Sequence, residues 1–387
     1  MRPAALAGVL VLAGLSMLEL KAEPVGGARL EPLSFSDMAG WAEDDHSAAF
    51  RVFRRSCAAI VNADPALRPA LAASPDLRAV CTTALALSDD PPQAEARRFF
   101  EARFQPLHVR LPSGDGFLTG YFEPEYDGSL TPTAEFQAPL LARPDDLVTV
   151  AQGETLPGLD PGLQAARRTA AGFSAYPDRA AIEDGALGDL AKPIVFVRDA
   201  VKVFVIQVQG SARIRLADGN LARVAYAGRN GLPYTSIGRI IVERGHVPLA
   251  EMSLERLMAW LRTNPRDGRE IMRQNRSYVF FRRVDELDPS DGPIGGASIP
   301  LTPGRSLAVD RSLWSYGLPF WVDGELPLAD GGSEPLRRLM IAQDTGTAIV
   351  GPARGDFFFG SGPEAGTRAG LLRHQTRFVV LLPKPAQ

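Results

Sequence analysis

Residues 308–317 read AVDRSLWSYG, residues 342–351 read AQDTGTAIVG and residues 354–360 read RGDFFFG, and these three stretches decide the fold. Each places one aspartate, Asp310, Asp344 or Asp356, beside a short apolar run and residues that favour tight turns. Aspartate is depleted inside strands, so its recurrence at the borders of apolar runs indicates more than solvent exposure. For Asp310 and Asp344 an Asx-turn, in which the carboxylate accepts from nearby backbone amides, is an equally good interpretation.

The segments around these stretches predict a chain that is helical first and β-rich afterwards. Residues 35–105 show helical spacing of apolar side chains, and prolines divide them into short helices. Residues 297–383 predict five or six short strands joined by Gly/Pro turns.

The middle of the chain predicts further strands with a few helices. Strands are expected at 118–124, entering a turn at 125–128, at 194–197 and at 201–209 (VKVFVIQVQ). Residues 221–226 should pair with 201–209 across the turn Asp218-Gly219-Asn220. Residues 237–243 suit a strand or a short helix, 253–274 a helical pair split at Asn264-Pro265, and 278–281 a strand.

Length and charge limit the classes of protein. The 387 residues predict two domains, or one large domain with an insertion. A net charge of -3 without a basic run gives no electrostatic case for nucleic acid. The four histidines, at 46, 108, 246 and 374, have no metal-ligand spacing, so neither a metal nor another cofactor is expected.

The first 23 residues are predicted to be a signal peptide. Arg2 precedes an apolar run at 4–18 that is too short to cross a bilayer comfortably. Leu15 stands where lipidation would need a cysteine. We therefore expect an exported, periplasmic protein; association with the outer membrane and an uncleaved N-terminal anchor stay open.

The two cysteines, Cys57 and Cys81, form a disulfide candidate. An even number of cysteines in an exported chain favours a disulfide, and here it would join two N-terminal helices. A pair of buried free thiols is the alternative.

A set of ordered motifs carries a family resemblance. Residues 119–124 (TGYFEP), 207–213 (QVQGSAR), 226–231 (YAGRNG), 234–239 (YTSIGR), 275–281 (NRSYVFF), 360–366 (GSGPEAG) and 379–384 (VVLLPK) accompany the three aspartate stretches. In this order they resemble the membrane-bound lytic transglycosylase A (MltA) family with its C-terminal 3D, or three-aspartate, module. The resemblance spans about residues 105–383.

The resemblance implies a mainly β fold with N-terminal helices, in which a double-psi β-barrel domain carries a second, inserted β domain. The barrel would comprise residues 24–113 and 282–387, with the 3D module at about 297–383. The insertion would comprise residues 114–281 and form the other wall of a glycan groove.

The resemblance also implies the reaction: non-hydrolytic cleavage of the β-1,4 bond between MurNAc and GlcNAc in peptidoglycan, which leaves 1,6-anhydroMurNAc ends. Asp356 matches the family's catalytic acid, with Asp344 and Asp310 in support. The binding partner would be the glycan strand of peptidoglycan. Partner proteins of cell-wall synthesis or hydrolysis are compatible with this function. The protein itself is expected to be a monomer. Candidate substrate-binding residues in the matching motifs are Tyr121, Gln209, Gly210, Ser211, Tyr226 and Tyr234.

Two other interpretations of the function stay open at this point. A non-catalytic glycan-binding or wall-loosening barrel protein would not need a desolvated acid. A hydrolysing muramidase would need a second carboxylate, for which Glu123 and Glu125 are the candidates in the motifs. Arg229 and Arg239 have the charge to meet a lactyl or peptide carboxylate, but a solvated surface explains each of them better.

Overall fold

The computed structural model describes residues 24–150, 154–284, 286–288, 291–328 and 330–385. The expected signal peptide at 1–23 lies outside these residues. Within them, no helix combines the length and the apolar character needed to span a bilayer.

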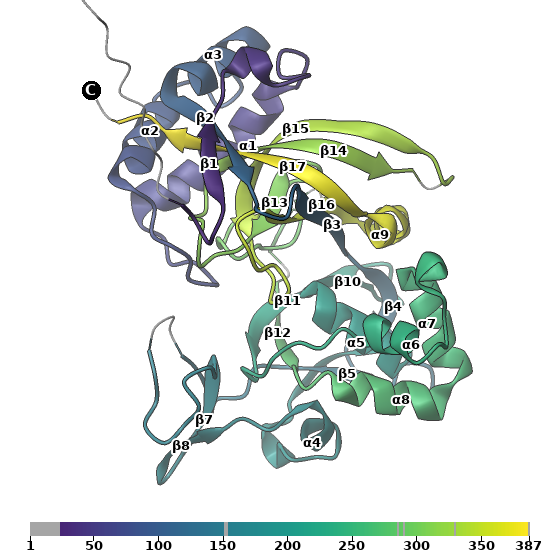
Figure 1. Ribbon diagram of the computed structural model, residues 1–387. Coiled ribbons are helices and arrows are strands. Elements are labelled where there is room, and N and C mark those ends of the chain that lie inside the picture. The colour runs from purple at the N-terminus through teal and green to yellow at the C-terminus, as the bar shows by residue number, and fades with distance from the viewer. Residues whose placement is uncertain (1–23, 151–153, 285, 289–290, 329, 386–387) are drawn as a thin grey trace, which may run out of the picture.

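Three helices form a layer on one side of a barrel: α1 (His46–Asn62), α2 (Pro75–Leu85) and α3 (Gln93–Arg103) (Figure 1). Asp45 caps the first and Ser74 the second, each side chain accepting from a backbone N–H of the first turn. Their apolar faces share one core with the barrel strands. The helices expected within 35–105 are confirmed.

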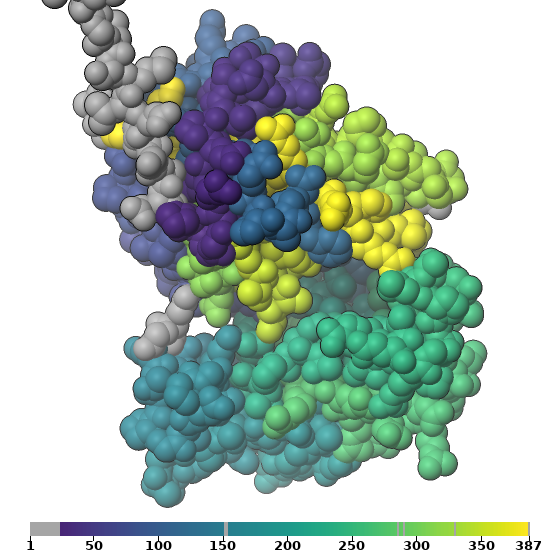
Figure 2. Space-filling model, in the orientation of Figure 1, coloured from purple at the N-terminus to yellow at the C-terminus, as the bar shows by residue number. Residues whose placement is uncertain are grey.

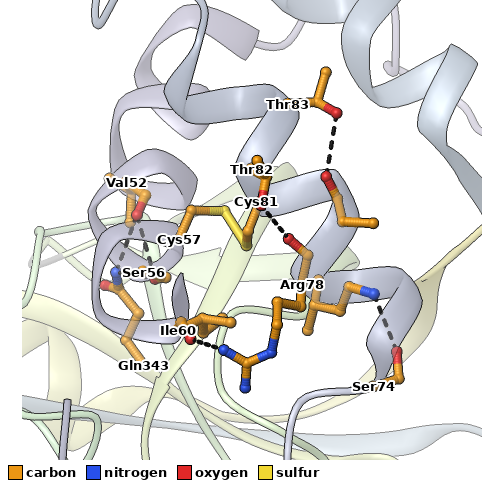
Figure 3. The surroundings of a disulfide bond; sticks show 12 residues. Val52, Ser56, Cys57, Ile60, Ser74, Arg78, Cys81, Thr82, Thr83 and Gln343 are labelled. Atoms are coloured by element: carbon orange, nitrogen blue, oxygen red, sulfur yellow. Dashed lines mark hydrogen bonds between the residues drawn. A yellow bond between two sulfur atoms is a disulfide. The ribbon is translucent and has the colours of Figure 1, made fainter. Parts of the chain in front are cut away.

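The predicted disulfide is confirmed. Cys57 of α1 is bonded to Cys81 of α2 (Figure 3). Beside it, Gln343 Nε2 donates to Ser56 Oγ at 2.9 Å and to Val52 O at 3.2 Å, which fixes α1 on the end of the barrel strand that leads to Asp344.

Six strands close into a barrel, in the order β17-β14-β15-β13-β16-β3, because β3 pairs with both β16 and β17. The expected fold class is confirmed, including five strands within 297–383. The bounds are β3 Gly116–Glu123, β13 Ser306–Val309, β14 Pro319–Pro327, β15 Ser333–Asp344, β16 Arg354–Ser361 and β17 Arg373–Pro383. β2 (Phe104–Arg110) and β1 (Arg29–Pro32) extend the sheet from β17. Helix α9 (Gly362–Leu371), which was not predicted, joins β16 to β17.

A second, six-stranded sheet lies beyond the barrel, in the order β12-β11-β10-β4-β9-β5 (Figure 1). Its strands are β4 Glu125–Ser129, β5 Ala138–Leu141, β9 Pro193–Val197, β10 Ser211–Arg215, β11 Leu221–Arg229 and β12 Val279–Arg283. Around it lie a small sheet of β6 (Leu147–Thr149), β7 (Ala165–Thr169) and β8 (Gly172–Ala175), and the helices α4 Arg179–Glu183, α5 Ala200–Gln209, α6 Ile237–Glu243, α7 Leu254–Thr263 and α8 Pro265–Gln274. Short 3₁₀ helices complete the elements at Phe35–Asp37, Gly188–Leu190 and Leu249–Glu251.

The chain passes from the barrel to the second sheet at Pro124, between β3 and β4. The boundary expected at residue 114 precedes β3, whereas β3 pairs within the barrel. The return follows β12, close to the expected residue 282.

The strand expected at 201–209 is wrong, because this segment is the helix α5. Its β-branched residues favour a strand locally, but the residues that cap the segment and the way it is buried favour a helix. Asp199 accepts from Lys202 N at 2.8 Å, and Gly210 ends the helix at φ 86. Apolar residues lie all around the helix because it is packed between the second sheet and α7.

The partner expected for 221–226 is therefore wrong as well. β11 pairs antiparallel with β10, which begins at Ser211 just after the helix, across the predicted turn at Asp218-Gly219-Asn220. The strand at 194–197, the helical pair and the strand near 278–281 are confirmed, and residues 237–243 form a helix.

Candidate active site

A cleft of about 250 Å3 lies between the barrel and the second sheet. Strands β3 and β16 and the loop 345–353 supply its barrel side, while the end of α5, β11 and the segment before β12 supply the other. Figure 2 shows the two bodies as distinct masses that meet along a waist. Two carboxylates line the cleft among the described residues, Asp344 and Asp356.

Asp356 lies in the middle of β16, opposite Thr119 of the parallel strand β3. Thr119 Oγ1 donates to Asp356 Oδ1 at 2.5 Å and accepts from Arg354 Nη2 at 2.7 Å. Burial raises the pKa of Asp356 to about 6, against the opposing effects of the Arg354 charge and the Thr119 hydrogen bond, while the charge of Asp344 adds to the rise. The carboxyl is therefore suited to carry a proton near neutral pH.

Asp344 ends β15 and is held by the backbone. Its Oδ1 accepts from Gly296 N at 2.7 Å and from Thr345 N at 2.8 Å. Burial raises its pKa, and Arg68 and the two amide bonds oppose the rise. The Tyr121 hydroxyl is buried, and no hydrogen bond of normal length and angle is formed by it among the described residues. Its burial and the charges of Asp344 and Asp356 raise the pKa of Tyr121 well above that of a free tyrosine.

Asp310 does not line the cleft. Its Oδ1 accepts from Ser312 N at 2.9 Å and from Ser312 Oγ at 2.6 Å, the Asx-turn considered from the sequence. Its Oδ2 accepts from Gly351 N at 2.7 Å. Because Gly351 belongs to the loop 345–353, Asp310 fixes the far end of a loop that forms one wall of the cleft.

All six predicted substrate-binding residues line the cleft: Tyr121, Gln209, Gly210, Ser211, Tyr226 and Tyr234. Two of them have structural contacts that explain their residue type. Gln209 Oε1 accepts from Phe122 N at 3.1 Å, which ties α5 to β3, and Gly210 provides the positive φ that ends α5. One face of the Tyr226 ring is covered by the Arg68 guanidinium at 4.2 Å.

Among the cleft residues that were not singled out from the sequence are Thr119, Arg354, Gln207 and Arg68. The first three stand inside quoted motifs, so their position beside Asp356 or Gln209 was the available signal. Gln207 Oε1 is buried without a hydrogen-bond partner among the described residues. Arg68 comes from the loop between α1 and α2, where no motif pointed to it.

The described residues contain no group of three or more His, Cys, Asp or Glu side chains arranged to hold a metal ion. The cleft itself presents buried carboxyl groups with hydroxyl, amide and guanidinium neighbours.

Comparison with known proteins gives this geometry its context. The family model of the MltA specific insert domain matches residues 117–282, and that of the 3D domain matches residues 305–382. Membrane-bound lytic murein transglycosylase A of Escherichia coli (strain K12) is 34% identical over 280 residues, which cover 70% of this chain and 67% of that protein. The chain belongs to the membrane-bound lytic murein transglycosylase A family.

Solved structures of this family agree with the assignment. A membrane-bound lytic murein transglycosylase from Agrobacterium tumefaciens superposes with a TM-score of 0.80 and 37% identity, covering 92% of this chain and 97% of that one. Escherichia coli MltA with bound chitohexaose has a TM-score of 0.63 and 26% identity over 94% of this chain and 95% of its own. The family resemblance inferred from the motifs is thus confirmed.

Proposed function

We propose that this protein is a peptidoglycan lytic transglycosylase that cleaves the β-1,4 bond between MurNAc and GlcNAc and leaves 1,6-anhydroMurNAc ends. Asp356 acts as the single acid and base. The observation that carries the proposal is a buried carboxyl, with a pKa raised to about 6, in the cleft between the two sheets. Membership of the family supports the reaction class.

One carboxyl suffices because the nucleophile belongs to the substrate. Protonated Asp356 donates its proton to the glycosidic oxygen as the bond to the anomeric carbon breaks. The carboxylate then accepts the proton of the 6-hydroxyl of the same MurNAc as that oxygen bonds to the anomeric carbon. A well-oriented intramolecular hydroxyl reaches effective molarities of ~10⁵ M or more, so no water needs to be activated.

The neighbours of Asp356 suit this double role. The acid form needs the raised pKa that burial supplies. The base form, a buried carboxylate, is stabilised by the Thr119 hydrogen bond and the Arg354 charge. Asp344 supports the site by orienting the Gly296 and Thr345 backbone, and Asp310 supports it by anchoring the loop at Gly351.

A hydrolysing muramidase is disfavoured by the positions of the two glutamates. Glu123 is buried away from the cleft lining, where it accepts from Arg213 Nε at 2.7 Å and Ser361 Oγ at 2.7 Å. Glu125 pairs with Arg215 and does not line the cleft either. Neither faces Asp356 across the space where a hydrolytic water would stand.

The glycan strand is proposed to lie in the cleft, in line with the chitohexaose bound to the Escherichia coli relative. The binding groups would be Tyr121, Gln207 and Tyr234 and the backbone around Gly210 and Ser211. We also propose a barrel domain and an inserted domain that form the two walls, with the first boundary at Pro124. Because peptidoglycan lies outside the cytoplasm, we propose that the protein is exported to the periplasm. We also propose that it acts there as a monomer.

The test is to digest purified sacculi and to analyse the released muropeptides by mass spectrometry. The proposal predicts anhydro ends, which are lighter by one water than reducing ends. Reducing ends would establish a muramidase instead. Binding without release would establish a wall-binding barrel protein, the alternative from another class.

A further inference from the structure

Three arginines act electrostatically in one place, Arg68 at the wall of the cleft and Arg229 and Arg311 behind it. Arg68 lines the cleft, Arg229 is 8% exposed, and Arg311 follows Asp310. Their hydrogen bonds go to neutral acceptors: Thr345 O for Arg68, Thr347 Oγ1 for Arg229 and Pro69 O for Arg311. Among the described residues, no carboxylate forms a salt bridge with any of the three guanidinium groups.

The three guanidinium groups act on one another electrostatically. The pKa of Arg229 is lowered to about 10, chiefly by burial and also by the charges of Arg68 and Arg311, while Tyr226 opposes the fall. Asp344 is the acid whose charge acts on Arg68, but its Oδ1 already accepts from two backbone amides. Tyr226, Asp344 and Tyr316 raise the pKa of Arg68 against the effect of its burial, so Arg68 is charged in the cleft. Arg229 and Arg311 add positive charge behind it.

Arg68 is built to present its donors. Its guanidinium is stacked on the Tyr226 ring at 4.2 Å, which fixes its plane. The backbone of the loop is fixed too, because Arg68 N donates to Gly296 O at 3.0 Å and the Tyr316 hydroxyl donates to Arg68 O at 3.0 Å. A guanidinium has five N–H donors in a fork that matches a carboxylate, and one N–H of Arg68 is used by Thr345 O.

We propose that Arg68, backed by Arg229 and Arg311, is a carboxylate-recognition site within the cleft, and that it binds a carboxylate carried by the muramoyl unit of the substrate. This inference rests on the proposed function, because the glycan of peptidoglycan differs from a neutral chitin chain by its acidic groups. The carboxylate has two sources: the free lactyl group of a peptide-free MurNAc, or the stem peptide, whose attachment consumes the lactyl carboxylate.

The experiment measures binding in the Asp356→Asn background, so that no probe is cleaved. The probes are chitohexaose, which is neutral, peptide-free murein glycan, which carries lactyl carboxylates, and stem-bearing murein glycan. Charge-assisted hydrogen bonds are about twice as strong as neutral ones, so Arg68→Met should weaken binding of one carboxylate probe by about tenfold or more. Binding of chitohexaose should not change, and Arg68→Lys should recover part of the loss because it restores the charge without the fork.

The pattern of losses identifies the source of the carboxylate. A loss confined to peptide-free glycan assigns the lactyl group, and one confined to stem-bearing glycan assigns the peptide. Equal loss for all three probes would overturn the proposal, and so would no loss for any. Arg239→Gln is the matched control, because Arg239 is largely exposed and pairs with Glu243 on α6.

A second variant guards against misfolding of the Arg68 loop. Arg229→Gln changes a residue behind the wall of the cleft. We expect it to weaken binding of the same probe by about threefold. This difference from the unmodified residue should disappear at high salt, because salt screens the attraction between the charges. If Arg68→Met unfolds, an unchanged affinity of Arg229→Gln for both acidic glycans overturns the proposal. These are binding measurements, so a failure of the proposed reaction would appear separately, as missing anhydro products from the unmodified protein.

Discussion

Asp356 owes its chemistry to a balance between burial and two stabilising neighbours. Burial alone would keep the carboxyl protonated and leave a poor base, whereas Thr119 and Arg354 make the ionised form accessible. Asp344 acts in the opposite direction through its charge. Because these effects have opposite signs, single substitutions should move the titration of Asp356 in predictable directions.

The first prediction concerns the pH dependence of kcat/KM on sacculi. The acid must start protonated, so the rate should fall about tenfold per pH unit above the pKa of about 6. Thr119→Val removes a hydrogen bond that lowers this pKa and should shift the fall to higher pH. Asp344→Asn removes a charge that raises the pKa and should shift the fall to lower pH.

Thr367→Val is the control for this profile, because Thr367 donates to Pro363 O on the exposed side of α9. Its profile should match that of the unmodified protein. Shifts of Thr119→Val and Asp344→Asn in the same direction would contradict the assignment of the titrating group to Asp356.

At the scale of elements, the disulfide holds α1 and α2 together beside the barrel. Only the loop 63–74, which includes Arg68, separates these two helices. The bond restricts the unfolded chain between Cys57 and Cys81, so it should stabilise the folded state by ~3 kcal/mol.

The second prediction is that the double variant Cys57→Ser, Cys81→Ser loses ~3 kcal/mol of free energy of unfolding in urea. The unmodified protein kept in a thiol reductant should show the same loss, since it lacks the same bond. Equal midpoints for oxidised and reduced protein would count against a stabilising role of the bond.

The elements were predictable from sequence where local signals agree with the packing. Helices α1 and α2 and the turn at 218–220 were predictable, because prolines, helix caps and turn residues next to them in the sequence favour the structure that is found. Helix α5 was not predictable in this way, because its β-branched run favours a strand and only tertiary packing on all sides makes it a helix. Because α5 was predicted as a strand, the strand pairing predicted for β11 was wrong as well.

At the scale of the whole molecule, Glu123 joins the two bodies where the chain crosses between them. It is 1% exposed, and three groups donate to its carboxylate: Arg213 of β10, Arg223 of β11 and Ser361 at the end of β16. The same arginines also donate to Asp291 O on the returning segment. One buried carboxylate thus links both crossings, and the placement of the walls of the cleft depends on it.

The third prediction is that Glu123→Gln destabilises the protein by about 3–5 kcal/mol, because two arginines would be left without their buried counter-charge. Glu125→Gln is the matched control: Arg215, its partner, is half exposed and the pair is screened by water, so the cost should be far smaller than for Glu123→Gln. Urea denaturation measures both. Equal costs for the two variants would show that Glu123 is not the link described.

The site was predictable from sequence as far as motifs reach. All six substrate-binding candidates and two of the three aspartates line the cleft, because the motifs stand at the strand and helix ends that face it. Asp310, for which support of the site and an Asx-turn were both open, lies outside the cleft lining, forms the Asx-turn and holds Gly351 of the loop. Arg68 could not be found, because only folding brings the loop after α1 to the second sheet.

The most direct test of the account is the release of anhydro-muropeptides from sacculi by Asp356→Asn, measured together with binding of the variant to chitohexaose. An amide cannot donate the proton of a carboxylic acid or take one from the 6-hydroxyl. We expect release to fall by about 1000-fold or more, with binding retained. Release at close to the unmodified rate would contradict the assignment of Asp356 as the acid and base.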